Sequence, residues 1–395
     1  MCRTVWIAAL TGLGAFAISF ANAQEILPSP TSPASPSSPT SPTTSPTTSP
    51  AQELLSPSDQ PLRPNDMPAA PPRFNEGFDS IDTLGAGMGR GGIGFGGFGL
   101  GASGPGGPAV LALTDRSSWY PNQRVAGQGT EFGFIKESIG LSVPLYRDGP
   151  NTIAFTTGVG ATIFTGNAIL PETGQPFPST IWNIHFGTNY THLFANDWLG
   201  TLGVSIGSSS DKPFENWSQV NFGLHAMLRI PSGECNAWLF SLSYSPLGQL
   251  GFPVPGVAFQ WVVRDWLRMN IGLPFVIVVT PTPDWQFTAS YMLLTTIHTQ
   301  LSYRVAPRVR IFAGYDWTNE GFHLAEQTNA HDRFLYYEMR VNVGTRFNWG
   351  QFRFDVSGGY AFDRFFAQGR GAFNTQNRVD IGNGPYLALT GSYRW

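Results

Sequence analysis

Residues 351–362 read QFRFDVSGGYAF, and this stretch decides the class of fold. Phe352 and Phe354 alternate with Arg353 and Asp355, so apolar and charged side chains lie on opposite faces of an extended chain. A period of two residues is typical of a β-strand and not of a helix. The same alternation recurs in other stretches of the C-terminal two thirds of the chain: 220–229, 297–305, 308–317 and 335–346.

These candidate strands have the features of strands that cross a membrane. They are about ten residues long, which suits a tilted strand crossing ~25 Å of hydrocarbon and exceeds the ~5–6 residues usual in soluble sheets. Their polar faces are rich in Gly, Ser, Asn and Arg, with few Lys and Glu. Aromatic residues gather near strand ends, as interfacial girdles require; they are Trp198, Trp238, Trp266, Trp285, Trp317, Trp349 and Tyr386.

The composition agrees with that assignment. Of the 395 residues, 12% are charged, about half the share of an ordinary soluble chain. The formal net charge is −3, so a nucleic-acid partner is not expected, because it would need a basic stripe. We therefore predict an all-β antiparallel transmembrane β-barrel over residues 112–395, of about 12–14 strands, preceded by a disordered Pro/Ser/Thr-rich and Gly-rich N-terminal segment.

The first 23 residues are predicted to be a cleaved signal peptide. Arg3 is the positive residue, residues 5–20 are the apolar segment, and residues 21–23 (ANA) supply the small residues that signal peptidase needs. The other reading of this segment is an uncleaved membrane anchor, because its length approaches that of a span. Cleavage would leave Cys235 as the one cysteine and exclude an intramolecular disulfide.

Residues 24–111 form a low-complexity leader. In residues 27–72, 30 of 46 are Pro, Ser or Thr, which favours a semi-stiff polyproline spacer. Residues 85–107 contain 13 glycines in 23 residues and a G-x-G-x-x-G, but no helix pattern follows, so a dinucleotide site is not predicted. The leader could reach a cell wall or a periplasmic partner, or have no selected role.

The last strand carries the most specific signal. In residues 385–395, PYLALTGSYRW, an outward set that includes Leu389 and Tyr393 ends on the aromatic Trp395. This resembles the terminal strand of bacterial outer-membrane proteins that the barrel-assembly machinery reads. The chain as a whole resembles uncharacterised outer-membrane β-barrel families with a Pro/Ser-rich leader. The resemblance implies a bacterial outer-membrane location, outer-membrane lipid and the assembly machinery as partners, and no activity.

The number of strands stays open between twelve and fourteen. Candidates begin near residues 130, 152, 180, 197, 217, 236, 254, 266, 284, 296, 308, 333, 350 and 385. An even number places both termini in the periplasm, but this count puts the long connection 164–179 on the periplasmic side, where short ones are expected. We therefore expect a miscounted element between residues 254 and 294, where Pro274 and residues 280–283 break the alternation.

Charged side chains inside the predicted strands fall mostly on the inward face. They could line a lumen that attracts anions, or fill the interior as Arg–carboxylate pairs that leave no path. The candidates for the lumen lining are Arg229, Arg268, Arg304, Arg310, Glu338, Arg340, Arg346, Arg353, Asp355 and Arg394.

No catalytic, metal or cofactor site is predicted. His185, His225 and His298 share the inward phase and are expected to be polar filling of the lumen. The stretch 319–332 is expected to be a solvated extracellular loop, because its acidic and His residues lack a ligand spacing; they are Glu320, His323, Glu326, His331 and Asp332. Ser290 and His298 lie on neighbouring candidate strands, but nothing in the sequence positions a third group.

Three functions are weighed on this basis. The favoured one is a passive, porin-like outer-membrane channel for small hydrophilic solutes, anions among them, without enzymatic activity. The alternative is a structural or anchoring protein with a plugged barrel. An outer-membrane hydrolase comes third. The sequence leaves open whether the lumen is open or plugged, which solute passes and what the oligomeric state is.

Overall fold

The computed structural model describes residues 111–394, apart from residues 234, 246, 248–249, 251, 328–331 and 372–373. The predicted signal peptide, both low-complexity segments of the leader and Trp395 lie outside the described residues. Among the described residues, no helix is long and apolar enough to cross a membrane. One short 3-10 helix, η1, covers Trp217–Gln219.

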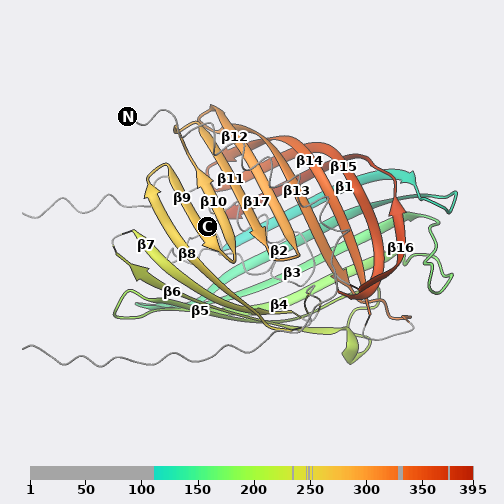
Figure 1. Cartoon of the computed structure of the whole chain (residues 1–395), viewed down its shortest axis with the longest axis horizontal. Coiled ribbons are helices and arrows are strands. Elements are labelled where there is room, and N and C mark those ends of the chain that lie inside the picture. The colour runs from blue at the N-terminus through green and yellow to red at the C-terminus, as the bar shows by residue number, and fades with distance from the viewer. Residues whose placement is uncertain are drawn as a thin grey trace, which may run out of the picture. The chain divides into compact units, whose positions relative to one another are not determined.

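The described chain is otherwise built of β-strands joined by turns and loops (Figure 1). In chain order they are β1 (Ala112–Arg124), β2 (Glu131–Asp148), β3 (Asn151–Gly166), β4 (Thr180–Leu193), β5 (Leu199–Ser210), β6 (Val220–Ser232), β7 (Asn236–Tyr244), β8 (Val254–Arg264), β9 (Leu267–Gly272), β10 (Phe275–Val279), β11 (Trp285–Met292), β12 (Thr296–Ala306), β13 (Val309–Phe322), β14 (Arg333–Trp349), β15 (Phe352–Gly371), β16 (Asn374–Ile381) and β17 (Gly384–Arg394).

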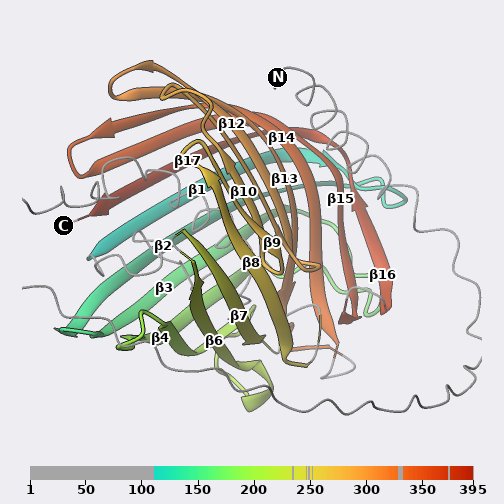
Figure 2. The same cartoon turned by 60° about the vertical axis from the view of Figure 1, so that its left-hand side comes forward.

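The strands close into a ring in which every pairing is antiparallel. Strands β1 to β15 pair in chain order, β15 also pairs with β17, and β17 pairs back onto β1 from Ala112↔Arg394 to Trp119↔Leu387 (Figure 2). Strand β16 pairs with the far part of β15, its last residue Ile381 forms an isolated bridge to Val125, and it is not one of the strands that close the ring. The predicted all-β antiparallel barrel is confirmed, and its ring has 16 strands.

The predicted count of twelve to fourteen strands is too low, because it misses β1 and β10. Strand β1 places Asp115 and Ser117 in the same phase as Leu113 and Trp119, so its apolar alternation is interrupted. Strand β10 reads FVIVV, which is apolar on both faces and only 5 residues long, and it follows Pro274. Neither segment shows the period of two that marks the other strands.

The two missed strands also resolve the conflict over loop lengths. Ala112 pairs with Arg394, so both termini of the barrel lie at one end, here called the terminal end. The connections at that end are short, as at residues 149–150, 307–308 and 350–351. The opposite end, here called the loop end, carries the long connections 167–179, 245–253 and 323–332. Counting β1 moves the long connection before β4 to the loop end.

The outer face of the ring carries an apolar belt. Large apolar side chains there are exposed, whereas their alternate neighbours face inward. Members of the belt come from strands all around the ring: Ile139, Val204, Phe222, Leu301, Ile311, Val341, Val343, Val356, Leu387 and Leu389. A belt of this extent exceeds the isolated exposed apolar groups of soluble proteins and is suited to contact with hydrocarbon.

Candidate functional site: the barrel lumen

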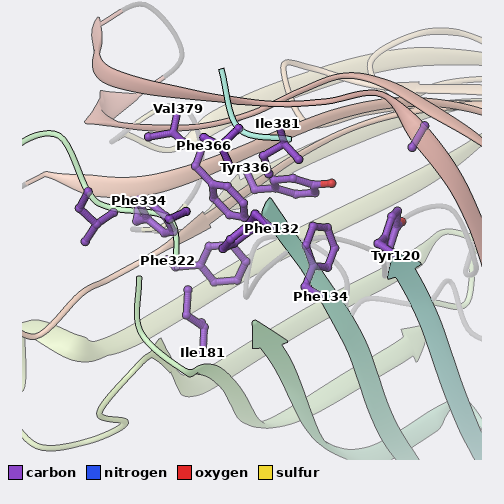
Figure 3. Close-up of a cluster of buried hydrophobic side chains, with 14 of the residues drawn as sticks. Tyr120, Phe132, Phe134, Ile181, Phe322, Phe334, Tyr336, Phe366, Val379 and Ile381 are labelled. Carbon is purple, nitrogen blue, oxygen red and sulfur yellow. The ribbon is translucent and has the colours of Figure 1, made fainter. Parts of the chain in front are cut away.

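The loop end of the lumen is filled by a cluster of aromatic side chains, here called the aromatic plug (Figure 3). The Phe366 ring lies near its centre, with centroids 4.8 Å from Phe334 and 4.7 Å from Tyr336. Most of these rings are fully buried, so water does not enter between them. The plug consists of Phe132, Phe134, Phe164, Phe177, Phe334, Tyr336 and Phe366.

The plug depends on a loop-end connection that folds inward. Phe177, from residues 167–179, places its ring 4.8 Å from that of Phe132 and 5.3 Å from that of Phe366. The Phe177 amide donates a hydrogen bond to the Ala168 carbonyl at 3.0 Å, which holds the connection as a compact hairpin-like loop. Leu170 of the same connection is buried in the cluster. The wall strands and this loop therefore close the lumen together.

A second connection crosses the mouth of the barrel. Residues 323–327, here called the strap, leave β13 and reach β5, where the His323 amide donates to the Ser209 carbonyl and the Ala325 amide to Asp211 Oδ1, each at 2.8 Å. Strands β6–β12 separate β5 from β13 on one side of the ring, and β14, β15, β17 and β1–β4 separate them on the other. The strap thus joins opposite walls.

An exposed ion pair fastens the strap further. Lys212 Nζ lies 3.0 Å from Glu326 Oε1. The hydrogen bond to Glu326 and its charge raise the pKa of Lys212, so this lysine stays protonated over the physiological range. An exposed pair of this kind adds little stability on its own, so the hydrogen bonds from the His323 and Ala325 amides hold the strap in place.

The strap is expected to loosen in acid. Burial, and next the positive charge of Arg333, lower the pKa of His323 to about 4 from the 6.5 of the free side chain. A released strap binds the proton more tightly than a docked one, so docking is favoured above pH ~6.5 and weakens as the pH falls toward 4. Hydrogen exchange of the strap amides, corrected for intrinsic rates, should speed up between pH 7 and pH 5.

The His323→Gln variant serves as the control for that pH dependence. Glutamine has no charge to gain in this range, so protection of the strap amides should then be the same at pH 7 and pH 5. Equal protection in the unaltered protein at both pH values would contradict a role of His323.

A charged network lies directly below the plug. The Glu338 carboxylate is 1% exposed and accepts hydrogen bonds from the Tyr336 hydroxyl at 2.6 Å and the Tyr120 hydroxyl at 2.9 Å. Arg340 Nη1 donates to Glu338 Oε1 at 3.2 Å and to the Tyr120 oxygen at 3.0 Å. The Arg364 guanidinium lies over the Tyr120 ring, 5.0 Å from its centroid. These contacts tie β14 and β15 to β1.

The network continues along the wall to β12. Arg340 Nε donates to Asp316 Oδ2 at 3.0 Å, and Asn342 Nδ2 donates to the same oxygen at 3.1 Å. A further hydrogen bond joins His298 Nδ1 to Asp316 Oδ1. Because an ionised carboxylate can only accept, the Nδ1–H of His298 is the donor. Four adjacent strands, β12 to β15, are linked in this way on the inside of the barrel.

One partly buried ion pair joins β2 to β13 across the lumen. Lys136 Nζ on β2 lies 2.8 Å from Glu320 Oε2 on β13, and its charge lies over the Tyr336 ring, 4.3 Å from the centroid. The expectation that Glu320 belongs to a solvated loop is wrong, because β13 continues to Phe322 and turns the carboxylate inward. The alternation of β13 continues through Glu320, but the acidic and histidine residues that follow led to the prediction of a loop from residue 319 onward.

On the side of β2 and β17, the lumen opens toward the terminal end. Along the inward face of β2, Phe132 and Phe134 are fully buried, Lys136 is partly exposed and Ser138 is exposed. The inward residues of β17 show the same trend, from buried Tyr386 and Ala388 to half-exposed positions beyond residue 390. On this side of the ring the inward side chains thus become accessible toward the terminal end, whereas the inward side chains of Ser302, Phe312 and Arg346 on β12–β14 stay buried close to that end.

The ten predicted lumen residues do not form one site. Glu338 and Arg340 belong to the network under the plug. Arg346 makes a two-pronged contact with Asp355, Nε to Oδ1 and Nη2 to Oδ2, both 2.9 Å, and Arg353 Nη2 lies 3.4 Å from the same carboxylate. This second group lies nearer the terminal end of β14 and β15.

The other predicted arginines are spread around the ring. Arg229 Nε donates to Gln260 Oε1 at 3.1 Å, and Arg304 Nε lies 3.9 Å from Asp284 Oδ1. Arg268, Arg310 and Arg394 are partly exposed and each makes a polar or charged contact of its own. Alternation within single strands could not identify Tyr120, Lys136, Asp316 and Arg364 as the partners of these residues, because their roles depend on contacts between strands.

The three inward histidines do not meet. His185 and His225 each lie opposite a glycine of the preceding strand, Gly158 and Gly203, where a Cβ atom would collide with the imidazole. His298 belongs to the Asp316 network. Within the described part of the chain, no group of three or more His, Cys, Asp or Glu side chains could hold a metal ion.

Comparison with known protein families and with curated proteins finds no match. Solved structures with a similar strand arrangement include a Pseudomonas aeruginosa FadL homologue (10% identity, 72% of this chain and 90% of that one, TM-score 0.32) and the translocator domain of the autotransporter NalP from Neisseria meningitidis (11% identity, 73% and 89%, TM-score 0.28).

A mutant of the TodX monoaromatic hydrocarbon channel is similar at 9% identity over 81% of this chain and 99% of that one, with a TM-score of 0.38. TM-scores below 0.5 carry no argument about the present chain. The barrel is established by its own strand pairing, from β1 through β15 to β17 and back to β1.

Proposed function

We propose that this protein is an integral protein of the bacterial outer membrane, exported by its N-terminal signal, and that its barrel is a gated channel for small hydrophilic solutes, anions among them. The apolar belt supports the membrane location, since a closed ring leaves no unpaired strand edge toward lipid. Leu389 and Tyr393, on the outward face of β17, then serve as part of the signal read by the assembly machinery.

The observation that carries the channel proposal is the change along β2 and β17 from buried inward side chains at the loop end to accessible ones toward the terminal end. Polar and charged side chains follow the inward face from the terminal end up to the plug, where the strap and the connection 167–179 complete the closure. A barrel that serves only as an anchor does not require a water-accessible region in its lumen. A gate at the loop end explains both halves of the structure.

The second candidate is a structural or anchoring protein whose barrel never opens. The depth of burial in the aromatic plug favours it, because a dry aromatic cluster is costly to separate. In that case the leader would carry the function by reaching the cell wall or a periplasmic partner. The two candidates differ in whether the loop end ever opens.

A cross-link across the mouth tests the gate. Ser210 and His323 form the β-bridge that joins β5 to the strap, so cysteines at both positions are placed to form a disulfide; the exposed native Cys235 is replaced by serine. In planar bilayers the reduced Ser210→Cys/His323→Cys protein should show single-channel steps. The oxidised protein should be silent, and reduction should restore the steps.

The single variants, which cannot form the cross-link, are the control. Steps that persist unchanged after oxidation would rule out the strap as the gate. A folded, heat-modifiable barrel that stays silent when reduced would support the anchoring function instead. Where steps are seen, Arg353→Glu should shift the reversal potential toward cations, because it reverses a charge in the accessible half of the lumen.

A further inference from the structure

Strand register places a serine, a histidine and an aspartate side by side on the inner wall. Ser290 on β11 pairs directly with His298 on β12, and His298 pairs directly with Asp316 on β13. Directly opposite residues of antiparallel strands have Cβ atoms about 4.5–5.5 Å apart and point to the same face. The three side chains therefore form a row across three strands, here called the Ser–His–Asp row.

The hydrogen bonds of the row leave the histidine oriented as a general base. Asp316 holds the Nδ1–H of His298, and its other oxygen is fixed by Arg340 and Asn342. His298 Nε2 is buried and has no hydrogen-bond partner among the described residues. With the proton on Nδ1, Nε2 is the basic nitrogen, on the side of the ring away from Asp316. Ser290 lies on β11, the strand on the other side of β12 from Asp316, and its hydroxyl makes no hydrogen bond to Nε2 in this structure.

The wall beside Ser290 is lower than the rest of the barrel. Strands β9 and β10 contain 6 and 5 residues, against 20 in β15, and Figure 1 shows both ending far short of β15 and β16 at the loop end. At ~3.3 Å per residue and a tilt of ~40°, β9 rises only about 15 Å, less than the ~25 Å of a hydrocarbon band.

Ser290 lies at the rim of this low wall. It pairs with Val276, the second residue of β10, and the turn at residues 273–274 follows within two residues. The apolar side chain of Ile271 is exposed beside that turn. If the terminal end of the barrel is level with the inner edge of the bilayer, the rim lies at the depth of the acyl chains of the outer leaflet.

We propose that Ser290, His298 and Asp316 form the catalytic row of a serine hydrolase that acts on carboxylic esters with long acyl chains. The substrate reaches the row over the rim of the β9–β10 wall. Ser290 is the nucleophile, His298 the general base and acid, and Asp316 the residue that orients His298 and stabilises its charged form. This activity goes beyond the channel proposal and does not depend on the strap.

The chemistry balances with water as the second reactant. Ser290 Oγ attacks the carbonyl carbon while His298 Nε2 takes the hydroxyl proton. The ester C–O bond breaks, and the alcohol leaves with that proton. Water then adds to the acyl carbon, giving a proton to Nε2, which returns it to Ser290 Oγ as the carboxylic acid departs. Gln300 lies diagonal to Ser290, opposite Thr288, and its amide is a candidate donor to the developing oxyanion.

The test uses the full chain folded in detergent micelles, with a fluorophosphonate probe and p-nitrophenyl esters from acetate to palmitate. The probe should label Ser290, and ester turnover should fall by on the order of 10⁴-fold in Asp316→Asn and at least as far in Ser290→Ala, which removes the nucleophile. Turnover should rise with acyl-chain length, because the substrate enters from the apolar side.

Ser302→Ala is the matched control, since Ser302 is a buried inward serine of β12 outside the row. It should keep both labelling and turnover. No labelling and no turnover above the Ser290→Ala background, or labelling that persists in Ser290→Ala, would overturn the assignment. Turnover confined to short esters would overturn the substrate class. Heat-modifiable migration of each variant shows that a loss does not come from misfolding.

Discussion

Phe366→Ala should lower the free energy of unfolding of the barrel by about 3–5 kcal/mol, the usual cost of emptying a buried phenylalanine site. The Phe366 ring is 1% exposed and lies at the centre of the aromatic plug, with centroids 5.8 Å from Phe132, 5.6 Å from Phe164 and 5.3 Å from Phe177. The loss is measured by denaturant titration of the refolded protein.

The same variant distinguishes the two proposed functions. Removing the central ring loosens the contacts that close the loop end, so a gated channel should open more often, with more frequent conductance steps in bilayers. Phe354→Ala is the control, because Phe354 lies on the same strand but points outward and is exposed to lipid. Equal destabilisation by both substitutions would contradict the plug as the source of the stability.

Glu338→Gln should cost about 3–5 kcal/mol, the range for removing one partner of a buried ion pair. Glu338 accepts from Tyr120, Tyr336 and Arg340, and Arg364 Nε lies 3.8 Å from its Oε2. The glutamine leaves the buried guanidinium groups of Arg340 and Arg364 without their shared counter-charge. The measurement is again the midpoint of unfolding at constant slope.

Glu326→Gln makes the identical change in an exposed pair. Glu326 and Lys212 are mostly exposed, so this substitution should change the free energy of unfolding by less than about 1 kcal/mol. Comparable losses in the two variants would mean that the network below the plug does not hold β14 against β1.

The alternation of apolar and polar residues predicted most of the wall. Strands such as β12 and β14 were assigned close to their observed bounds because each carries the period of two along its own length, whereas β15 continues nine residues beyond the predicted stretch that ends at residue 362. Strands β1 and β10 were missed for the opposite reason: Asp115 and Ser117 interrupt the outward face of the first, and the second is apolar on both faces. The last third of β13 was missed, because Glu320 resembled a loop residue.

The functional groups of the lumen were harder to predict. The alternation of apolar and polar residues correctly predicted that Glu338 and Arg340 face the lumen, because the direction of a side chain is a local property of one strand. It could not pair them with Tyr120, which is 218 residues from Glu338, or pair Lys136 with Glu320, 184 residues apart. Likewise, the sequence analysis placed Ser290 and His298 on neighbouring strands. That Asp316 lies next to His298 became clear only from the register of β12 on β13.

The sequence by itself determined an all-β barrel with apolar residues outward and arginines inward, because side-chain direction in a strand depends only on position along that strand. Tertiary structure alone decided that sixteen strands close the ring, that aromatic rings and a strap close one end, and that β9 and β10 leave a low wall beside Ser290. Closure, register and contacts across a lumen join residues far apart in the chain, and no local period carries that information.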